Sequence, residues 1–180
     1  MPHVTFHRKG VTMLNSAYKE FDKIGAIIDH YASILLGIIV LVMFGSLLLQ
    51  VISRYFFNSP LSWPEEVTMF LMAWMSFIGA SVALRSWGHI GVDFFLQKCS
   101  GKKRIFLLLL IRLVALTFTL FLLVEGSLFV MGSAGIVSDG MRIPMVYPRL
   151  SMPIGGAIMT LHIITFILGD LHNLQTYKES

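Results

Sequence analysis

Four long apolar runs divide the chain, and each is long enough to cross a bilayer. Charged and polar residues gather between the runs, which cover residues 32–52, 67–84, 105–124 and 150–168. At about 1.5 Å per residue, a helix of roughly 20 residues spans the hydrocarbon core of a membrane. The fourth run reaches that length by including Leu150 to Pro153. The pattern predicts an all-α membrane protein with four transmembrane helices in one domain, residues 1–180.

Two stretches outside these runs are amphipathic. In residues 13–30, apolar side chains recur at helical spacing between charged ones, which predicts a helix lying in the headgroup plane. Residues 90–96 place Phe94 and Phe95 ahead of a basic cluster, as expected of a segment that contacts anionic phospholipid. An ordinary solvated linker is the alternative for each stretch.

Composition supports a membrane location. Hydrophobic residues make up 56% of the chain and charged residues 13%, with a mean hydropathy of +0.76. Soluble domains average about 45–50% apolar and 25% charged residues. Cys99 is the one cysteine, so an internal disulfide and dithiol redox chemistry are excluded. The net charge of +4 comes without a basic face or a nucleic-acid motif, so we expect no nucleic-acid partner.

The distribution of basic residues predicts the orientation. Ten of the 14 Lys and Arg residues lie before the first run, between the second and third runs, or after the fourth. Three, Arg54, Arg142 and Arg149, lie on the other side, and Arg112 lies within the third run. Basic residues are retained on the cytoplasmic side, so both termini are expected in the cytoplasm.

The second span opens with a polar motif that permits two readings. Ser62 is placed to cap the helix, Pro64 falls in its first turn, and Glu65 and Glu66 lie at the positive end of the helix dipole. Capping explains most of this motif. Alternatively, Glu65 or Glu66 pairs with Arg54 or with a basic group on a partner. Trp63, like Trp87, Phe94 and Phe95, is expected at the lipid interface.

Few polar residues fall inside the spans. Arg112 shares a small and polar helix face with Ala115 and Thr119, so it either pairs within the bundle or snorkels to headgroups. His162 fits an interhelical hydrogen bonder better than a proton relay. No motif for a metal, a cofactor, a nucleophile or a phosphate is present, so we expect neither cofactor nor enzyme activity.

Small residues line one face of the second span. They are Ala73, Ser76, Ala80 and Ala83, with Gly79 beside them. Small residues at this spacing let helix backbones approach closely in lipid. We expect this face, together with Arg112, to pack against a partner in the membrane.

The segment between Arg54 and Phe95 resembles the small membrane subunit of tripartite ATP-independent periplasmic (TRAP) transporters. The resemblance rests on the order and spacing of Arg54-Tyr55-Phe56, Trp63-Pro64-Glu65-Glu66, Trp74-Met75-Ser76-Phe77-Ile78-Gly79-Ala80, Arg85 and His89-Ile90-Gly91-Val92-Asp93. It covers about a quarter of the chain with high specificity. Length and the four-span topology extend it weakly over the remainder.

This resemblance implies a role in a bacterial inner membrane. The chain would scaffold a large multispanning transport subunit, while a periplasmic substrate-binding protein delivers an organic acid, such as a dicarboxylate or a sialic acid, for sodium-driven uptake. Arg54, Glu65, Glu66, Arg142 and Arg149 would then face the periplasm, where charges are available to the binding protein. The rival readings are a small channel or ion-coupled carrier acting alone and, with less support, an intramembrane enzyme.

The orientation is tested with Cys99 as a probe. Because its loop is predicted to be cytoplasmic, a membrane-impermeant thiol reagent should label Cys99 in lysed cells and spare it in intact cells whose outer membrane has been permeabilised. Labelling of Cys99 in the intact cells would contradict the predicted orientation.

Overall fold

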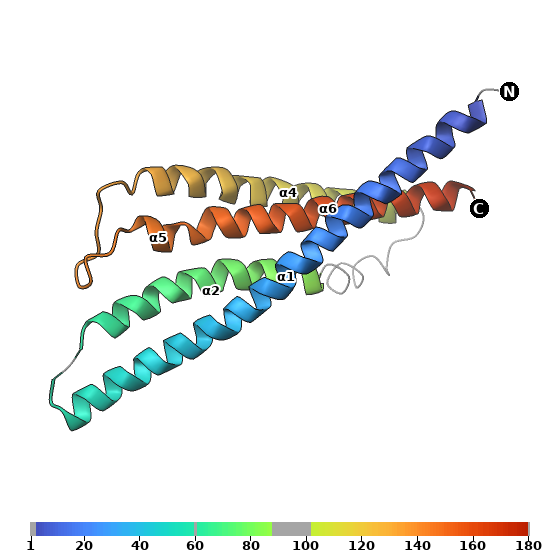
Figure 1. The fold of residues 1–180 in the computed structure, drawn as a ribbon. Coiled ribbons are helices and arrows are strands. Elements are labelled where there is room, and N and C mark those ends of the chain that lie inside the picture. The colour runs from blue at the N-terminus through green and yellow to red at the C-terminus, as the bar shows by residue number, and fades with distance from the viewer. Residues whose placement is uncertain (1–2, 60, 88–101, 180) are drawn as a thin grey trace.

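The computed structural model of the chain is a bundle of four long helices (Figure 1). The structure describes the backbone of residues 3–59, 61–87 and 102–179 and the side chains of 18–59, 61–86 and 107–170. The elements are α1 (His3–Phe56), α2 (Trp63–Trp87), α4 (Lys102–Met131), the short α5 (Val146–Arg149) and α6 (Ser151–Glu179). Four helical stretches are long and apolar enough to cross a membrane, as the sequence predicts.

The first helix is longer than the first predicted span. Residues 13–30 are helical, but they continue into the span without a break and form no helix of their own. No proline interrupts residues 3–56, and single glycines such as Gly25 do not end a helix that packs along its length. The structure therefore gives α1 an N-terminal extension in place of a separate helix. Residues 90–96 lie outside the described residues.

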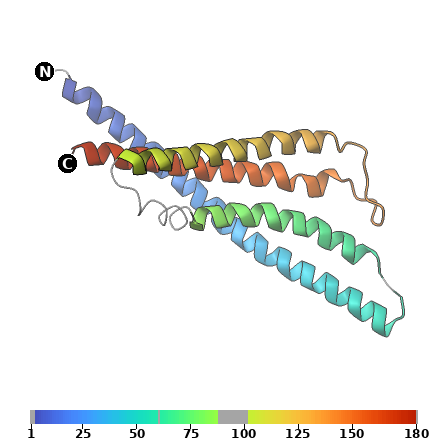
Figure 2. The same cartoon turned by 180° about the vertical axis from the view of Figure 1, so that it is seen from behind.

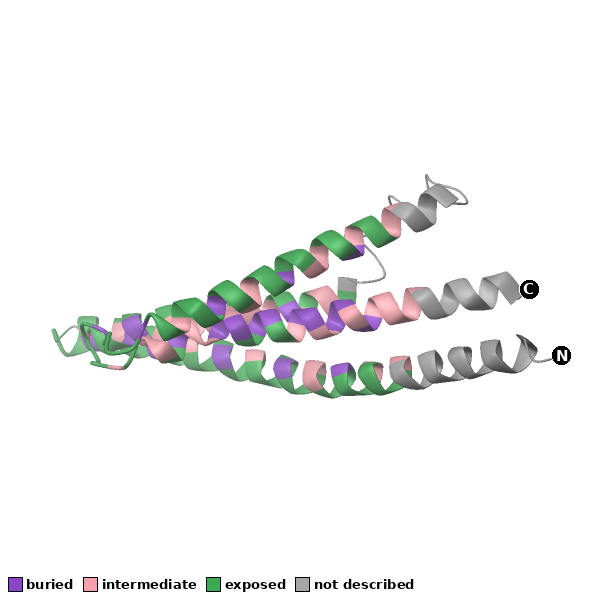
Figure 3. Ribbon diagram, turned by 90° about the horizontal axis from the view of Figure 1, so that it is seen from above, coloured by how far each residue is buried: buried purple, intermediate pink, exposed green. Residues whose placement is uncertain are grey.

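One narrow stripe of α1 contacts the rest of the bundle. Buried or half-buried residues recur every three or four positions along one side of α1, while those around them, apart from the half-buried Ile28, are exposed (Figure 3). The stripe consists of Tyr18, Asp22, Gly25, Asp29, Ala32, Leu36, Ile39, Met43, Ser46, Gln50 and Ser53. A seven-residue repeat of this kind keeps one seam toward a neighbouring helix through a slight left-handed wrap.

The central helix is α6. It packs against α1, α2 and α4, and α1 also packs against α2. In the most apolar stretch of the fourth span 44% of the residues are buried, against 17%, 11% and 11% in the first, second and third spans. Within the described part of the chain, α4 rests chiefly on α6, with α5 beside its end. The bundle is consequently open between α2 and α4.

Two adjacent glycines bring α6 close to both neighbours. A methyl group on Gly155 would lie 2.6 Å from Cβ of Phe77 in α2, and one on Gly156 would lie 3.0 Å from the backbone nitrogen of Leu123 in α4. On the facing helix, a methyl group on Gly126 would lie 2.9 Å from the backbone nitrogen of Pro153. These helices therefore meet nearly backbone to backbone, which any larger side chain would prevent.

Ion pairs join the helices at the end of the bundle that carries both termini, here called the terminal end (Figures 1 and 2). Arg85 of α2 donates to the Asp22 carboxylate of α1 at 3.0 Å, and Arg112 of α4 donates to Asp170 of α6 at 3.2 Å. The opposite end, here called the loop end, carries residues 57–62 and 132–145.

The glycine contacts predict sharply different effects of the same substitution. Gly155→Leu or Gly156→Leu should force α6 away from α2 or α4 and lower the thermal midpoint in detergent, with loss of the monodisperse species. Gly37→Leu and Gly45→Leu are matched controls, because nothing lies within 4 Å of the added carbon at either position. Thermal unfolding followed by size-exclusion chromatography measures both. Equal midpoints for the two pairs would show that the close contacts do not hold the bundle.

Candidate partner-binding surfaces

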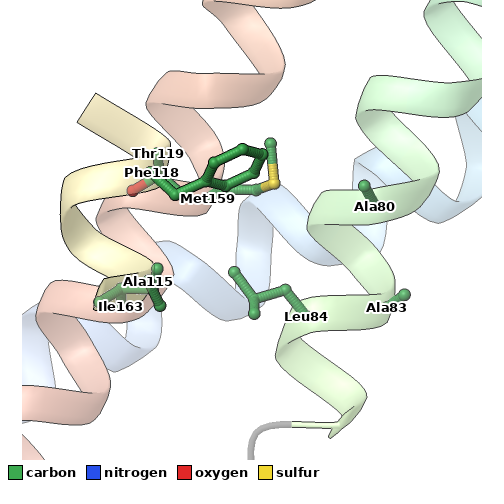
Figure 4. A pocket seen from close by; sticks show the side chains of 8 residues that line it. All are labelled: Ala80, Ala83, Leu84, Ala115, Phe118, Thr119, Met159 and Ile163. Atoms are coloured by element: carbon green, nitrogen blue, oxygen red, sulfur yellow. The ribbon is translucent and has the colours of Figure 1, made fainter. Parts of the chain in front are cut away.

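The opening between α2 and α4 forms a groove floored by α6. Its lining is Ala80, Ala83 and Leu84 from α2, Ala115, Phe118 and Thr119 from α4, and Met159 and Ile163 from α6 (Figure 4). The groove encloses about 380 Å³. The Thr119 hydroxyl donates to the Leu116 carbonyl at 3.1 Å, so its donor is already used within α4. An apolar groove with alanine on both walls can receive an apolar ridge of another helix.

The small-residue face of α2 splits into two parts. Ser76, Ala80 and Ala83 are exposed, Ala73 is half-buried, and the Ser76 hydroxyl donates to the Met72 carbonyl within the helix. Gly79 instead faces α1, since a methyl group there would lie 3.9 Å from a Leu36 methyl carbon. Gly79 therefore serves packing within this chain, and the other residues remain available to a partner.

Arg112 is engaged inside the bundle. Its side chain is nearly buried, its Nε donates to Asp170 at 3.2 Å, and its guanidinium lies over the Phe166 ring at 4.7 Å from the centroid. Of the two alternatives, pairing within the bundle or snorkelling to headgroups, the structure shows pairing, and this pair joins α4 to α6. Arg112 is a link between two helices of this chain, so its expected contact with a membrane partner gains no support.

At the loop end, Glu66 holds a hairpin-like loop. Its carboxylate accepts hydrogen bonds from the backbone N–H groups of Gly140, at 3.3 Å, and Met141, at 2.6 Å. The loop closes on itself through Val137, which bridges Pro144, and through Ser138, whose N–H donates to the Ile143 carbonyl at 2.9 Å. A carboxylate that accepts two backbone N–H groups pins the tip of this loop to the start of α2.

The charged residues expected at the loop end fall into two groups. Arg149 donates to Ser133, and its guanidinium lies over the Phe129 ring at 4.3 Å, so it ties α5 to the end of α4. Arg54, Glu65 and Arg142 are exposed. Arg142 lies in the tip of the loop with a φ of 56°, a backbone conformation that residues other than glycine rarely adopt.

Exposed aromatic side chains gather where α1 and α2 meet the loop end. Trp63 is partly exposed, and Tyr55, Phe56 and Phe57 are exposed by 75%, 81% and 73%. Aromatic residues at the end of a span are typical of a membrane interface. The run Tyr55-Phe56-Phe57, three aromatic residues at the end of a span, is the sequence signal for this interface. The side chain of Trp87 and all of Phe94 and Phe95 lie outside the described residues.

Among the described residues, no group of three or more His, Cys, Asp or Glu could hold a metal ion. The surfaces are an apolar groove, an exposed helix face and a few charges at one end. This arrangement defines a small helical membrane protein with four candidate spans.

Comparison with known proteins identifies the family. Residues 32–173 match the model of the DctQ component of tripartite ATP-independent periplasmic transporters, and the chain belongs to that family. It is therefore a small TRAP permease subunit of the DctQ and SiaQ type.

Curated relatives carry names of the same family. The chain is 26% identical to the C4-dicarboxylate TRAP transporter small permease protein DctQ of Vibrio cholerae, over 80% of this chain and 72% of the relative. It is 24% identical to the sialic acid TRAP transporter small permease protein SiaQ of the same organism, over 78% of this chain and 81% of the relative. The sialic acid TRAP transporter permease protein SiaT of Haemophilus influenzae is 28% identical over 79% of this chain, but the match spans only 23% of SiaT.

Proposed function

We propose that this subunit scaffolds a large multispanning transport subunit in sodium-driven, binding-protein-dependent uptake of an organic acid. The observation that carries the proposal is the apolar groove between α2 and α4, bordered by the exposed small-residue face of α2. In lipid, helices associate through close van der Waals contact and interhelical hydrogen bonds. A groove of this shape suits a helix of the large subunit.

The groove does not suit the solute itself. An anionic acid needs donors or positive charges, and the groove lining consists of alanine, leucine, phenylalanine, methionine and isoleucine with one threonine whose donor is used. Arg85 at the end of the second span and Arg112 within the third each pair with an aspartate of this chain, so neither charge is left for a solute. These features favour a scaffold over a channel or carrier that acts alone.

The relatives support the class of solute and the association with a larger membrane part. Two are named for sialic acid and C4-dicarboxylates, which share carboxylate groups. In SiaT, the matched region is about a quarter of one longer permease chain. Because a region similar to this chain is part of a longer permease chain in SiaT, we propose that this chain is a separate subunit that binds a large transport subunit permanently.

The proposed setting is the bacterial inner membrane, with the terminal end in the cytoplasm and phospholipid around the exposed apolar faces. The basic-residue distribution supports this orientation. The loop end then faces the periplasm, where Arg54, Glu65 and Arg142 are exposed and can contact the soluble binding protein. Glu66 and Arg149 support these groups indirectly by holding the loop.

The central test is reconstitution into liposomes with a sodium gradient. The complete system should accumulate the acid, whereas this chain alone should not, and the large subunit with the binding protein should lose most activity without it. Ala80→Leu should narrow the groove and reduce co-purification with the large subunit by about tenfold, which corresponds to about 1.4 kcal/mol. Gly45→Leu, an exposed change on α1, is the matched control. Solute accumulation by this chain alone, or full transport without it, would refute the scaffold.

The contact with the binding protein is tested at Arg142. Rim charges mainly set the association rate, so Arg142→Glu should raise the binding-protein concentration needed for half-maximal uptake and leave the maximal rate unchanged. Arg149→Glu is the contrasting variant: it breaks the link to Ser133 and Phe129 and should lower thermal stability as well. If Arg142→Glu follows the wild-type titration curve, Arg142 does not contact the binding protein.

A further inference from the structure

A second polar cluster lies inside the bundle near the terminal end and takes no part in the surfaces described above. It joins α1, α2 and α6 through Asp22, Asp29, Arg85 and His162, grouped around Gly25. A methyl group on Gly25 would lie 2.5 Å from Nη1 of Arg85 and 3.3 Å from Nδ1 of His162. The missing side chain of Gly25 is what lets both polar groups reach α1.

Two groups in this cluster have unmet hydrogen-bonding capacity. His162 is fully buried, and among the described residues neither of its ring nitrogens has a hydrogen-bond partner. The Oδ1 atom of Asp29 is also buried without a partner there. A buried polar group left unpaired destabilises the folded state, and more so where the group is charged. Such groups in native proteins are nearly always satisfied.

Arg85 does not satisfy them. Its Nη2 donates to Asp22, to the carboxylate at 3.0 Å and to the backbone carbonyl at 3.3 Å. Asp29 follows Gly25 by four residues, one turn along the face of α1 that His162 approaches at Gly25. The unpaired groups therefore both lie where α1 and α6 meet.

The charges and hydrogen-bonding groups of this cluster decide what can lie between Asp29 and His162. A metal ion would need more ligands than one imidazole and one carboxylate, and the guanidinium of Arg85 would repel it. An anion would be repelled by Asp22 and Asp29. A water molecule can donate to a carboxylate oxygen and at the same time bond one imidazole nitrogen, and buried waters make two to four such bonds.

We propose that an ordered internal water bridges His162 of α6 and Asp29 of α1. The bridge fastens α1 to the central helix two turns from the Arg85 ion pair with Asp22. It satisfies polar groups that have no direct partner among the described residues, and it makes His162 a positioning residue for α1.

The direct test uses the unsubstituted full chain in lipid bilayers. In solid-state NMR, polarisation transferred from water protons should reach a ring nitrogen of His162, assigned through its backbone, even though the ring is fully buried. His30, which is exposed, is the positive reference. A response at His30 with none at His162 would overturn the proposal.

Variants test the coupling independently. His162→Leu and Asp29→Leu should each lower the thermal midpoint by roughly 3–8 °C, because each removes one end of the bridge and leaves the other buried polar group poorly satisfied. The double variant should recover most of that loss, since no orphaned group remains. Thr165→Val is the matched control on α6: its hydroxyl already donates to the Leu161 carbonyl at 2.9 Å, so it should not couple to Asp29→Leu. A midpoint for His162→Leu at or above the unsubstituted value, or additive losses in the double variant, would contradict the water bridge.

Discussion

The close approach of α6 to both α2 and α4 is the constraint on which the rest of the structure depends. Within a bilayer, burial of apolar surface gives little drive for helices to associate, so attraction comes from how closely they approach. Adjacent glycines at 155 and 156 point to different neighbours, and Gly126 completes the contact on α4. Because α6 occupies the space between them, α2 and α4 stay apart, and the groove between them has α6 as its floor.

Polar contacts then hold the two ends of this bundle. At the terminal end, two arginine–aspartate pairs join α2 to α1 and α4 to α6. At the loop end, Glu66 holds the tip of residues 132–145 through two backbone N–H groups, and Arg149 joins α5 to α4. Between the ends, serine and threonine hydroxyls such as those of Thr160 and Thr165 donate to carbonyls of their own helix. The middle of the bundle therefore depends on packing distance, and the ends depend on charge.

The sequence predicts the spans well because charge-free runs report directly where hydrocarbon can surround a helix. It does not predict the length of α1, since hydropathy shows where the lipid begins but not where the helix does. The exposed face of α2 follows from helical spacing, whereas the direction of Gly79 depends on where α1 lies. The pairing of Arg112 with Asp170 and of Glu66 with the loop joins residues 58 and 74–75 positions apart, which no local pattern encodes. The sequence likewise predicts an available charge at Arg149, because its contacts with Ser133 and Phe129, 16 and 20 positions away, are not encoded locally.

The distribution of large and small side chains distinguishes two kinds of exposed surface on the bundle. The outer sides of α1 and α4 expose bulky residues, including Leu41, Phe44, Leu113 and Phe121. Flexible side chains of this size make favourable contact with disordered acyl chains. Ala80, Ala83 and Ala115 at the groove offer lipid much less contact area, but they allow another backbone to come near. Since α4 rests chiefly on α6 on one side, a helix seated in the groove would support α4 on a second side and complete a layer that this chain leaves open.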